Sequence, residues 1–310
     1  MRRTLRGACV LLSAVAPMIA IPSARAGDAI APPQQEAASA LVEIPSWTVR
    51  LPKDANVVYK GEVSFDSAGK GTGSMLYPAV SAVTMLAAVV THALLVESSK
   101  SRQKDNMQEE ADKVLIPYQS VLGDYKHQEL MQRGLELTST PGTKRLIQFS
   151  EQVGADWVVD SVPVFWITQD QSAIVLDNSI SVHPPSAPST AVSRYTVRVV
   201  SNARGETDLA GYWTAEGGQK LKEQSAGLFA QSLDIALGQS RGATSKSDEV
   251  FRTVRYRQGK AEKMERGRLI GAHCDRIVVK TLRGWFMSVP VVRNEADIGA
   301  DDQCAHAPGS

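Results

Sequence analysis

The sequence predicts an α+β protein with three parts: a long helical region near the N-terminus, a mixed domain of helices and an antiparallel hairpin, and a C-terminal antiparallel β meander. Three observations predict this fold. Residues 76–96 carry no charge and have helical periodicity, residues 157–182 change to strand-like patterns, and residues 250–292 have strand-like patterns throughout. The first residues also predict that the chain is made for export from a bacterial cytoplasm.

The N-terminus has the three parts of a secretory signal peptide. Arg2, Arg3 and Arg6 form a positive head, an uncharged apolar stretch follows, and Ala24 and Ala26 are the small residues that a signal peptidase recognises. We therefore expect cleavage before Gly27. The chain then divides by composition into a signal peptide (1–26), a flexible Ala/Pro/Gln-rich leader (27–46), an α+β domain (47–238), a linker (239–249), a basic β module (250–292) and a tail (293–310).

The first elements of the α+β domain are a strand within residues 57–65 and the uncharged helix of residues 76–96. Serine, threonine, tyrosine and histidine side chains form a narrow polar stripe on this helix, which lowers the free energy gained by membrane insertion. Lys100, Arg102 and Lys104 follow at once, so a membrane span here would return the rest of the chain to the cytoplasm. A buried core helix is favoured, and membrane association through residues 76–96 stays open.

The later elements follow from hydrophobic periodicity and turn residues. A charged helix is expected from about residue 100 to Ile116, ended by Pro117, and a second helix from Lys126 to Leu137. Trp157–Ile167 is apolar on both faces and predicts a strand inside the core, paired as a hairpin with the alternating strand that follows. A strand near Tyr195–Val199, a helix over 216–238, and four strands near 250–257, 263–269, 276–282 and 285–291 complete the fold.

Charge and cysteine content limit the classes of function. The chain has 34 basic and 33 acidic residues, and loss of four arginines with the signal peptide leaves a net charge of −3, which does not predict a nucleic-acid partner. Two cysteines remain after cleavage, Cys274 and Cys304, and an oxidising compartment favours one disulfide between them. Free thiols or a metal site with His273, Asp302 and His306 are the alternatives, although the spacing matches no standard zinc motif.

No complete catalytic motif is present. Ser101 and Lys104 have the Ser-x-x-Lys spacing of penicillin-binding serine enzymes, but the partner motifs of that class are missing. The histidines show no metal-ligand spacing, and the aspartates Asp156, Asp160, Asp170 and Asp177 are equally suited to turns and strand ends. We predict no cofactor and no metal.

The basic β module is the best candidate surface. Its side chains would attract an envelope protein, anionic lipid head groups or a cell-wall polymer, although basic residues on exposed strand positions also discourage aggregation. The candidate residues are Arg252, Arg255, Arg257, Arg266, Arg268, Arg276, Lys280 and Arg283. The expected function is that of an exported, periplasmic cell-envelope protein acting as a non-catalytic binding or assembly module. The alternatives are an inner-membrane subunit anchored by residues 76–96 and a hydrolase with an unrecognised serine site.

Overall fold

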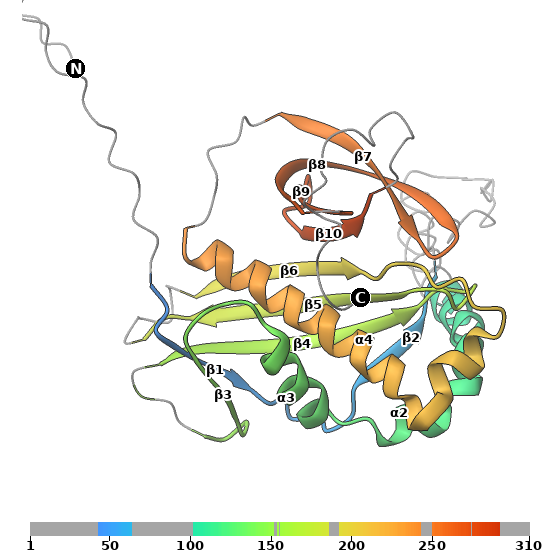
Figure 1. Ribbon diagram of the computed structural model, residues 1–310, viewed down its shortest axis with the longest axis horizontal. Helices are drawn as coiled ribbons and strands as arrows, with labels where there is room; N and C mark the ends of the chain where they lie inside the picture. Colours follow the sequence, from blue (N-terminus) through green and yellow to red (C-terminus); the bar gives the residue numbers. More distant parts are fainter. Residues whose placement is uncertain are drawn as a thin grey trace, which may run out of the picture. The chain divides into compact units, whose positions relative to one another are not determined.

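A computed structural model describes residues 43–63, 102–151, 154, 156–185, 192–242, 250–273 and 275–291. Its fold is α+β, with a large mixed sheet of ten strands and helices packed on it (Figure 1). Residues 102–112 are helical, and the other helices are η2 (Lys113–Tyr118), α2 (Gln119–Asp124), α3 (His127–Leu137) and α4 (Leu209–Ser240). The strands are β1 (Ser46–Arg50), β2 (Val58–Gly61), β3 (Thr143–Ile147), β4 (Trp157–Ile167), β5 (Ile174–His183), β6 (Ser193–Val200), β7 (Phe251–Gln258), β8 (Ala261–His273), β9 (Arg276–Thr281) and β10 (Phe286–Pro290).

The sheet combines local hairpins with distant parallel pairs. Its strand order is β3-β1-β4-β5-β6-β10-β9-β8-β7, and β2 also pairs with β4. The pairs β4–β5, β5–β6, β7–β8, β8–β9 and β9–β10 are antiparallel, whereas β1–β3, β1–β4, β2–β4 and β6–β10 are parallel. The parallel pair β6–β10 joins the C-terminal strands to the rest of the sheet.

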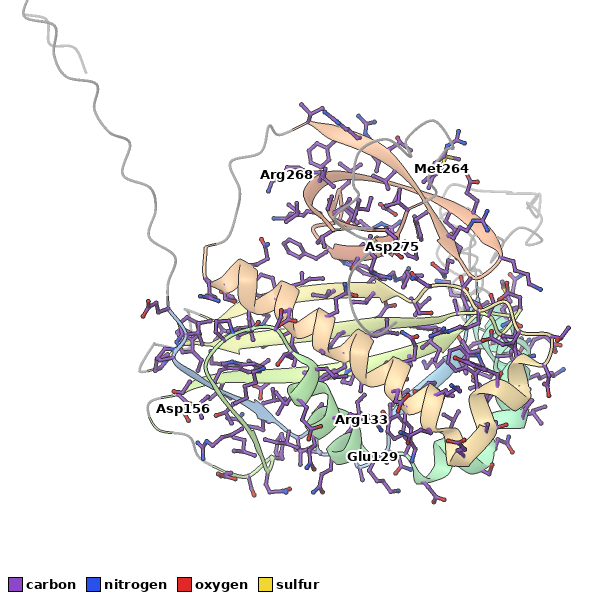
Figure 2. All side chains as sticks on the ribbon, in the orientation of Figure 1. Glu129, Arg133, Asp156, Met264, Arg268 and Asp275 are labelled. Carbon is purple, nitrogen blue, oxygen red and sulfur yellow. The ribbon has the colours of Figure 1, made fainter. Side chains whose placement is uncertain are left out.

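The main hydrophobic core lies between one face of the sheet and the helices α3 and α4. Alternate strand residues such as Trp47, Phe165, Leu176 and Val197 are fully buried there, together with Phe229 of α4. α4 crosses β5 and β6 with α3 beside it (Figure 1). Two surface ion pairs, from Glu129 to Lys222 and from Arg133 to Glu223, link α3 to α4, and both α3 residues are labelled in Figure 2.

A second hydrophobic cluster covers part of the opposite face. Val175 of β5 and Val200 of β6 are buried there against Tyr256, Val279 and Met287 of the C-terminal strands. An antiparallel bridge between Tyr256 and Val291 brings β7 back to the end of β10. The curled strands β7–β10 therefore pack on the sheet that they also extend.

The short strands β1 and β2 pair with β4 end to end along one of its edges. Trp157–Asp160 pair with β1 and Val164–Ile167 pair with β2, which leaves residues 161–163 between them. Pro163 lies in this gap, where its missing N–H removes no bond to β1 or β2. The expectation that β4 is buried on both faces is wrong near this gap, because Val162 is 60% exposed.

Most predicted elements in the described residues are confirmed. The strand Trp157–Ile167, its hairpin with β5, the helix ending at Leu137 and the four C-terminal strands are present. The helix expected over 216–238 begins earlier, at Leu209, and is interrupted by non-helical backbone from Ala215 to Gly218. The prediction that Pro117 ends the charged helix is wrong, because the helix changes to a 3-10 helix at Lys113 that contains Pro117 and continues to Tyr118, where α2 follows.

Several predictions fall on other parts of the chain. The signal peptide, the leader up to residue 42, the helix 76–96, Cys274, Cys304 and the tail lie outside the described residues. The long N-terminal helical region therefore stays a prediction, of which residues 102–112 are the described part. Among the helices that the structure describes, none has both the length and the hydropathy for a membrane span. The division at 239–249 also stays a prediction, and the sheet continues across it through β6 and β10.

Candidate anion-binding surface

Alternation along β7 and β8 gathers basic side chains on one exposed face. Arg255 and Arg257 lie on the exposed side of β7, and the register pairs this side with Met264 and Arg266 of β8 and with their neighbours. Arg268 is opposite Phe251 on one strand and opposite Lys280 on the other. We call Arg255, Arg257, Arg266, Arg268 and Lys280 the outer basic face.

Little negative charge offsets the outer basic face. Glu262 is the carboxylate on this side of the β7–β8 hairpin, opposite Arg257. It lies 3.5 Å from the guanidinium of Arg255, with both side chains largely exposed. An exposed ion pair of this kind contributes about 0–1 kcal/mol. The five cations of the outer basic face and Glu262 together carry a net charge of +4.

Exposed apolar side chains accompany these cations. Met264 is 65% exposed and Phe251 is 44% exposed on the same side of the hairpin. Met264 and Arg268 are labelled on these strands in Figure 2. Leu269, Leu282 and Val250 are also exposed nearby in the chain. Half of the exposed large hydrophobic residues of the described chain thus lie within residues 250–282.

Three predicted surface residues are placed differently. Arg252 is exposed on the other side of β7, in line with Val254 and Tyr256, and Arg283 is exposed in the turn between β9 and β10. Arg276 instead reaches back toward β6. Its guanidinium donates to the carbonyl oxygen of Val200 at 2.5 Å and to the carbonyl oxygen of Ser288 at 3.1 Å.

Burial lowers the pKa of Arg276, and the nearby Asp275 only partly opposes this effect. The guanidinium is thus a structural donor between β6, β9 and β10. We exclude it from the outer basic face.

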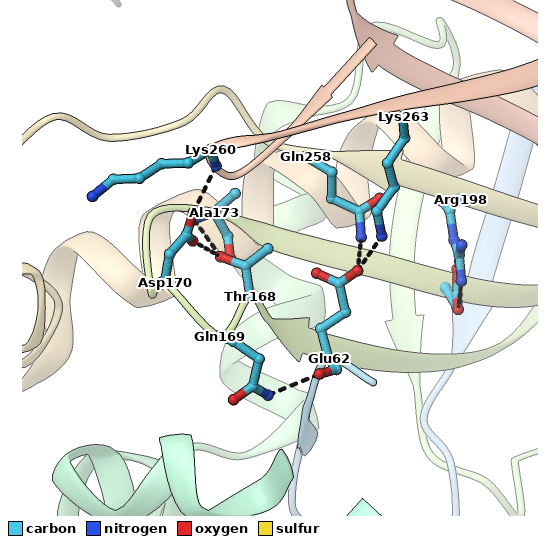
Figure 3. A network of polar contacts seen from close by, with 10 residues as sticks. Glu62, Thr168, Gln169, Asp170, Ala173, Arg198, Gln258, Lys260 and Lys263 are labelled. Atoms are coloured by element: carbon cyan, nitrogen blue, oxygen red, sulfur yellow. Dashed lines mark hydrogen bonds and ion pairs between the residues drawn. The ribbon is translucent and has the colours of Figure 1, made fainter. Parts of the chain in front are cut away.

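Polar contacts fix the tip of the β7–β8 hairpin against the sheet (Figure 3). The carboxylate of Glu62, just after β2, accepts hydrogen bonds from Gln258 and Lys263. The carboxylate of Asp170 accepts from the backbone N–H of Lys260 at 2.6 Å and from its own turn. We call Glu62, Asp170, Gln258, Lys260 and Lys263 the hairpin anchor.

Hydrogen bonds from its own turn and from Lys260 favour the charged form of Asp170. Burial alone would raise the pKa of Asp170, but hydrogen bonds from Thr168, Ser172 and Lys260 outweigh this effect and lower the pKa below its usual value. Sequence reasoning did not find the anchor, because Glu62 and Gln258 are 196 positions apart. It positions the outer basic face relative to the sheet.

The four aspartates considered as catalytic carboxylates each have another partner. Arg198 binds Asp177 through two 2.6 Å hydrogen bonds, and Arg50 contacts Asp160 at 3.3 Å. Asp156 accepts from Ser46, Arg145 and Thr48, and these hydrogen bonds lower its pKa. These contacts account for the positions of the carboxylates.

Most of the other sequence candidates lie outside the described residues. Lys104 is exposed on the helix 102–112, and Ser101 lies outside the described residues. No cluster of three or more histidine, cysteine, aspartate or glutamate side chains with metal-binding geometry is found in the part of the chain that the structure describes. Cys274, Cys304, Asp302 and His306 lie outside that part.

Comparisons with known proteins give no family for this chain. Comparisons of the chain with models of protein families, with curated proteins and with solved structures find no match.

Proposed function

We propose that this protein is an exported, non-catalytic module of the cell envelope that binds anionic lipid head groups through its outer basic face. The observation that carries the proposal is the gathering of Arg255, Arg257, Arg266, Arg268 and Lys280 on one side of a curled sheet. Export rests on the signal peptide read from the sequence.

The chemistry of the face favours a lipid surface over a soluble partner. Near an anionic membrane each Lys or Arg contributes about 1 kcal/mol of attraction, so five cations acting together suffice for reversible binding. The exposed side chains of Phe251 and Met264 lie on the same side of the hairpin as the arginines and can enter the interfacial region of the bilayer. A soluble polymer would use the charges alone.

A vesicle experiment tests the proposal. Residues 27–310 would be mixed with phosphatidylglycerol vesicles and with phosphatidylcholine vesicles, and the bound fraction measured by sedimentation. We expect binding to the anionic vesicles that weakens with added salt. The variant Arg255→Glu/Arg257→Glu should lose most of this binding. The matched variant Arg102→Glu/Lys104→Glu changes two exposed charges on the helix 102–112 and should bind like the unaltered protein.

Two results would argue against lipid binding. Equal losses in both variants would mean that net charge, not the outer basic face, determines binding. Retention on the vesicles that soluble polyphosphate abolishes, while Phe251→Ser/Met264→Ser changes nothing, would identify an anionic polymer as the partner instead.

A further inference from the structure

A trough runs between α3 and the edge strand β3, far along the sheet from the outer basic face. Two adjoining cavities of about 570 and 580 Å³ form it and share Leu51, Gln128 and Gln148 in their linings. Further along, the trough is lined by Gln132, Leu135, Glu136, Lys144 and Leu146. We call it the α3–β3 trough.

The α3–β3 trough has a floor of leucine side chains and walls that carry glutamine side-chain amides. Leu135 from α3, Leu146 from β3 and Leu51 after β1 form the floor. The helical spacing of 128, 132 and 135 and the strand spacing of 144, 146 and 148 place each set on one side of its element. The side-chain amides of Gln128, Gln132 and Gln148 are exposed and have no hydrogen-bond partner among the described residues. Such amides can both donate to and accept from a peptide backbone.

β3 supplies an open strand edge beside the trough. It is the first strand in the sheet order, and in the part of the chain described by the structure it pairs with β1 alone. An exposed edge next to a helix-lined groove is the arrangement in which an extended peptide adds a strand and places alternate side chains in pockets.

Charge indicates what kind of strand could bind there. The sequence of β3 includes Lys144 and Arg145, so antiparallel pairing with a second copy would bring like charges together. At the other end of the trough Lys53 and Lys126 lie near the start of α3, with Asp54 as the acidic group. Because a helix N-terminus carries partial positive charge, this end favours a carboxylate.

We infer that the α3–β3 trough binds an extended peptide segment of another protein. The peptide pairs with β3, places an apolar side chain on Leu51, Leu135 and Leu146, and sets a carboxylate at the end formed by Lys53 and Lys126. This site is separate from the outer basic face and does not depend on lipid binding.

Hydrogen exchange and fluorescence anisotropy test this inference on residues 27–310. The probe is a set of labelled peptides in which valine and leucine alternate with threonine and the last residue is aspartate. We expect binding with a Kd below about 1 mM and slower exchange at Thr143–Ile147. Peptides with proline in place of the central threonine should not bind, because they lack a backbone donor. Amidated peptides without the aspartate should bind more weakly.

Matched variants locate the site. Gln132→Glu and Gln148→Glu place negative charge in the trough and should weaken binding by about ten-fold. Thr253→Glu makes a comparable change on the exposed side of β7 and should have no effect. Arg255→Glu/Arg257→Glu should also bind the peptides normally, which separates this inference from the proposed lipid binding.

Three results would overturn the inference. One is no binding by any peptide of the set at about 1 mM. Another is equal binding by the proline peptides, and a third is protection of Thr143–Ile147 that increases with protein concentration without peptide, which would show that β3 pairs two copies.

Discussion

At the scale of single residues, one carboxylate fixes the connection that follows α3. Asp234 of α4 accepts hydrogen bonds from the backbone N–H and hydroxyl of Ser139 and of Thr140, at 2.6–2.9 Å. Thr140 is buried, so its N–H has no access to water as a replacement. Asp234 thereby ties the segment before β3 to the helical layer.

We predict that Asp234→Ala destabilises the protein. Four hydrogen bonds to a charged acceptor are lost and a buried donor is left unpaired, for which about 2–4 kcal/mol is expected. Urea unfolding followed by tryptophan fluorescence measures the change in the free energy of unfolding. Glu136→Ala, at an exposed position of α3, is the control and should change it by less than about 0.5 kcal/mol. A similar small change for Asp234→Ala would contradict this account.

His127 gives the protein a pH-dependent stability. Its Nδ1 lies 2.8 Å from the carbonyl oxygen of Asp54, an acceptor, so Nδ1 carries the proton. Nε2 is buried without a hydrogen-bond partner among the described residues. Burial lowers the pKa of His127 below the usual 6.5, and the Asp54 carbonyl only partly opposes this. The folded protein therefore holds the neutral imidazole.

The lowered pKa of His127 makes the stability of the protein depend on pH. As the pH falls below about 6.5, the unfolded chain takes up a proton that the folded chain does not, so stability should fall by up to about 1.4 kcal/mol per pH unit. Urea unfolding from pH 7.5 to 5 would measure it, and His127→Gln should remove the slope. His183→Gln should retain it, because His183 is half-exposed beside Asp160. A flat profile in the unaltered protein would refute the prediction.

At the scale of elements, Gly61 sets the contact between β2 and the helix 102–112. Its N–H donates to the carboxylate of Asp112 at 2.7 Å, and the side-chain amide of Gln108 donates to its carbonyl oxygen at 3.1 Å. A Cβ at this position would lie 1.9 Å from the carbonyl oxygen of Ala111. Only glycine allows the helix to approach the strand this closely.

Gly61→Ala should therefore force the helix away from β2. We expect a loss of about 1–3 kcal/mol from the free energy of unfolding, as for other overpacking substitutions. Thermal and urea unfolding would measure it. Gly123→Ala is the control, because a Cβ there meets nothing within 4 Å and α2 accepts alanine. If both variants were equally stable, the close approach at Gly61 would have no energetic importance.

The sequence predicted elements with strong periodicity and missed short ones. β4, β5 and α3 have enough residues for a pattern, and their predicted bounds agree closely with the structure. β1 and β3 have five residues each, and TKRLI in β3 has no clear alternation. The interruption of α4 at Glu216–Gly218 was missed because it depends on positive φ angles and on the contact of Gly218 with Val121.

At the scale of the whole molecule, the sheet topology could not be predicted. The parallel pairs β1–β4 and β6–β10 join segments that are far apart in the sequence, and no local pattern specifies such partners. For the candidate site, Arg255 and Arg257 share a face because they are two residues apart on β7. Alternation could not show that Arg276 would turn toward the backbone of β6, because that contact requires the β6–β10 pair.

We predict that a chain ending at residue 242 does not fold as a monomer. Without β10 the edge of β6 is unpaired, and Val175 and Val200 lose the cover of Tyr256 and Met287. Sedimentation and circular dichroism would show aggregation or loss of the cooperative thermal transition. A monomeric fragment with the melting temperature of residues 27–310 would instead show that the segments on either side of 239–249 are independent domains.

The pairing of β6 with β10 also sets the order in which the protein can be completed during synthesis. β6 ends at Val200, but its partner begins only at Phe286, close to the end of the chain. A ribosome has therefore made nearly the whole polypeptide before the central sheet can close, and the edge of β6 stays unpaired while residues 201–285 are added. Native folding is accordingly expected to follow translation, and a released chain that ends before Phe286 should be degraded by protease faster than a released chain that includes β10.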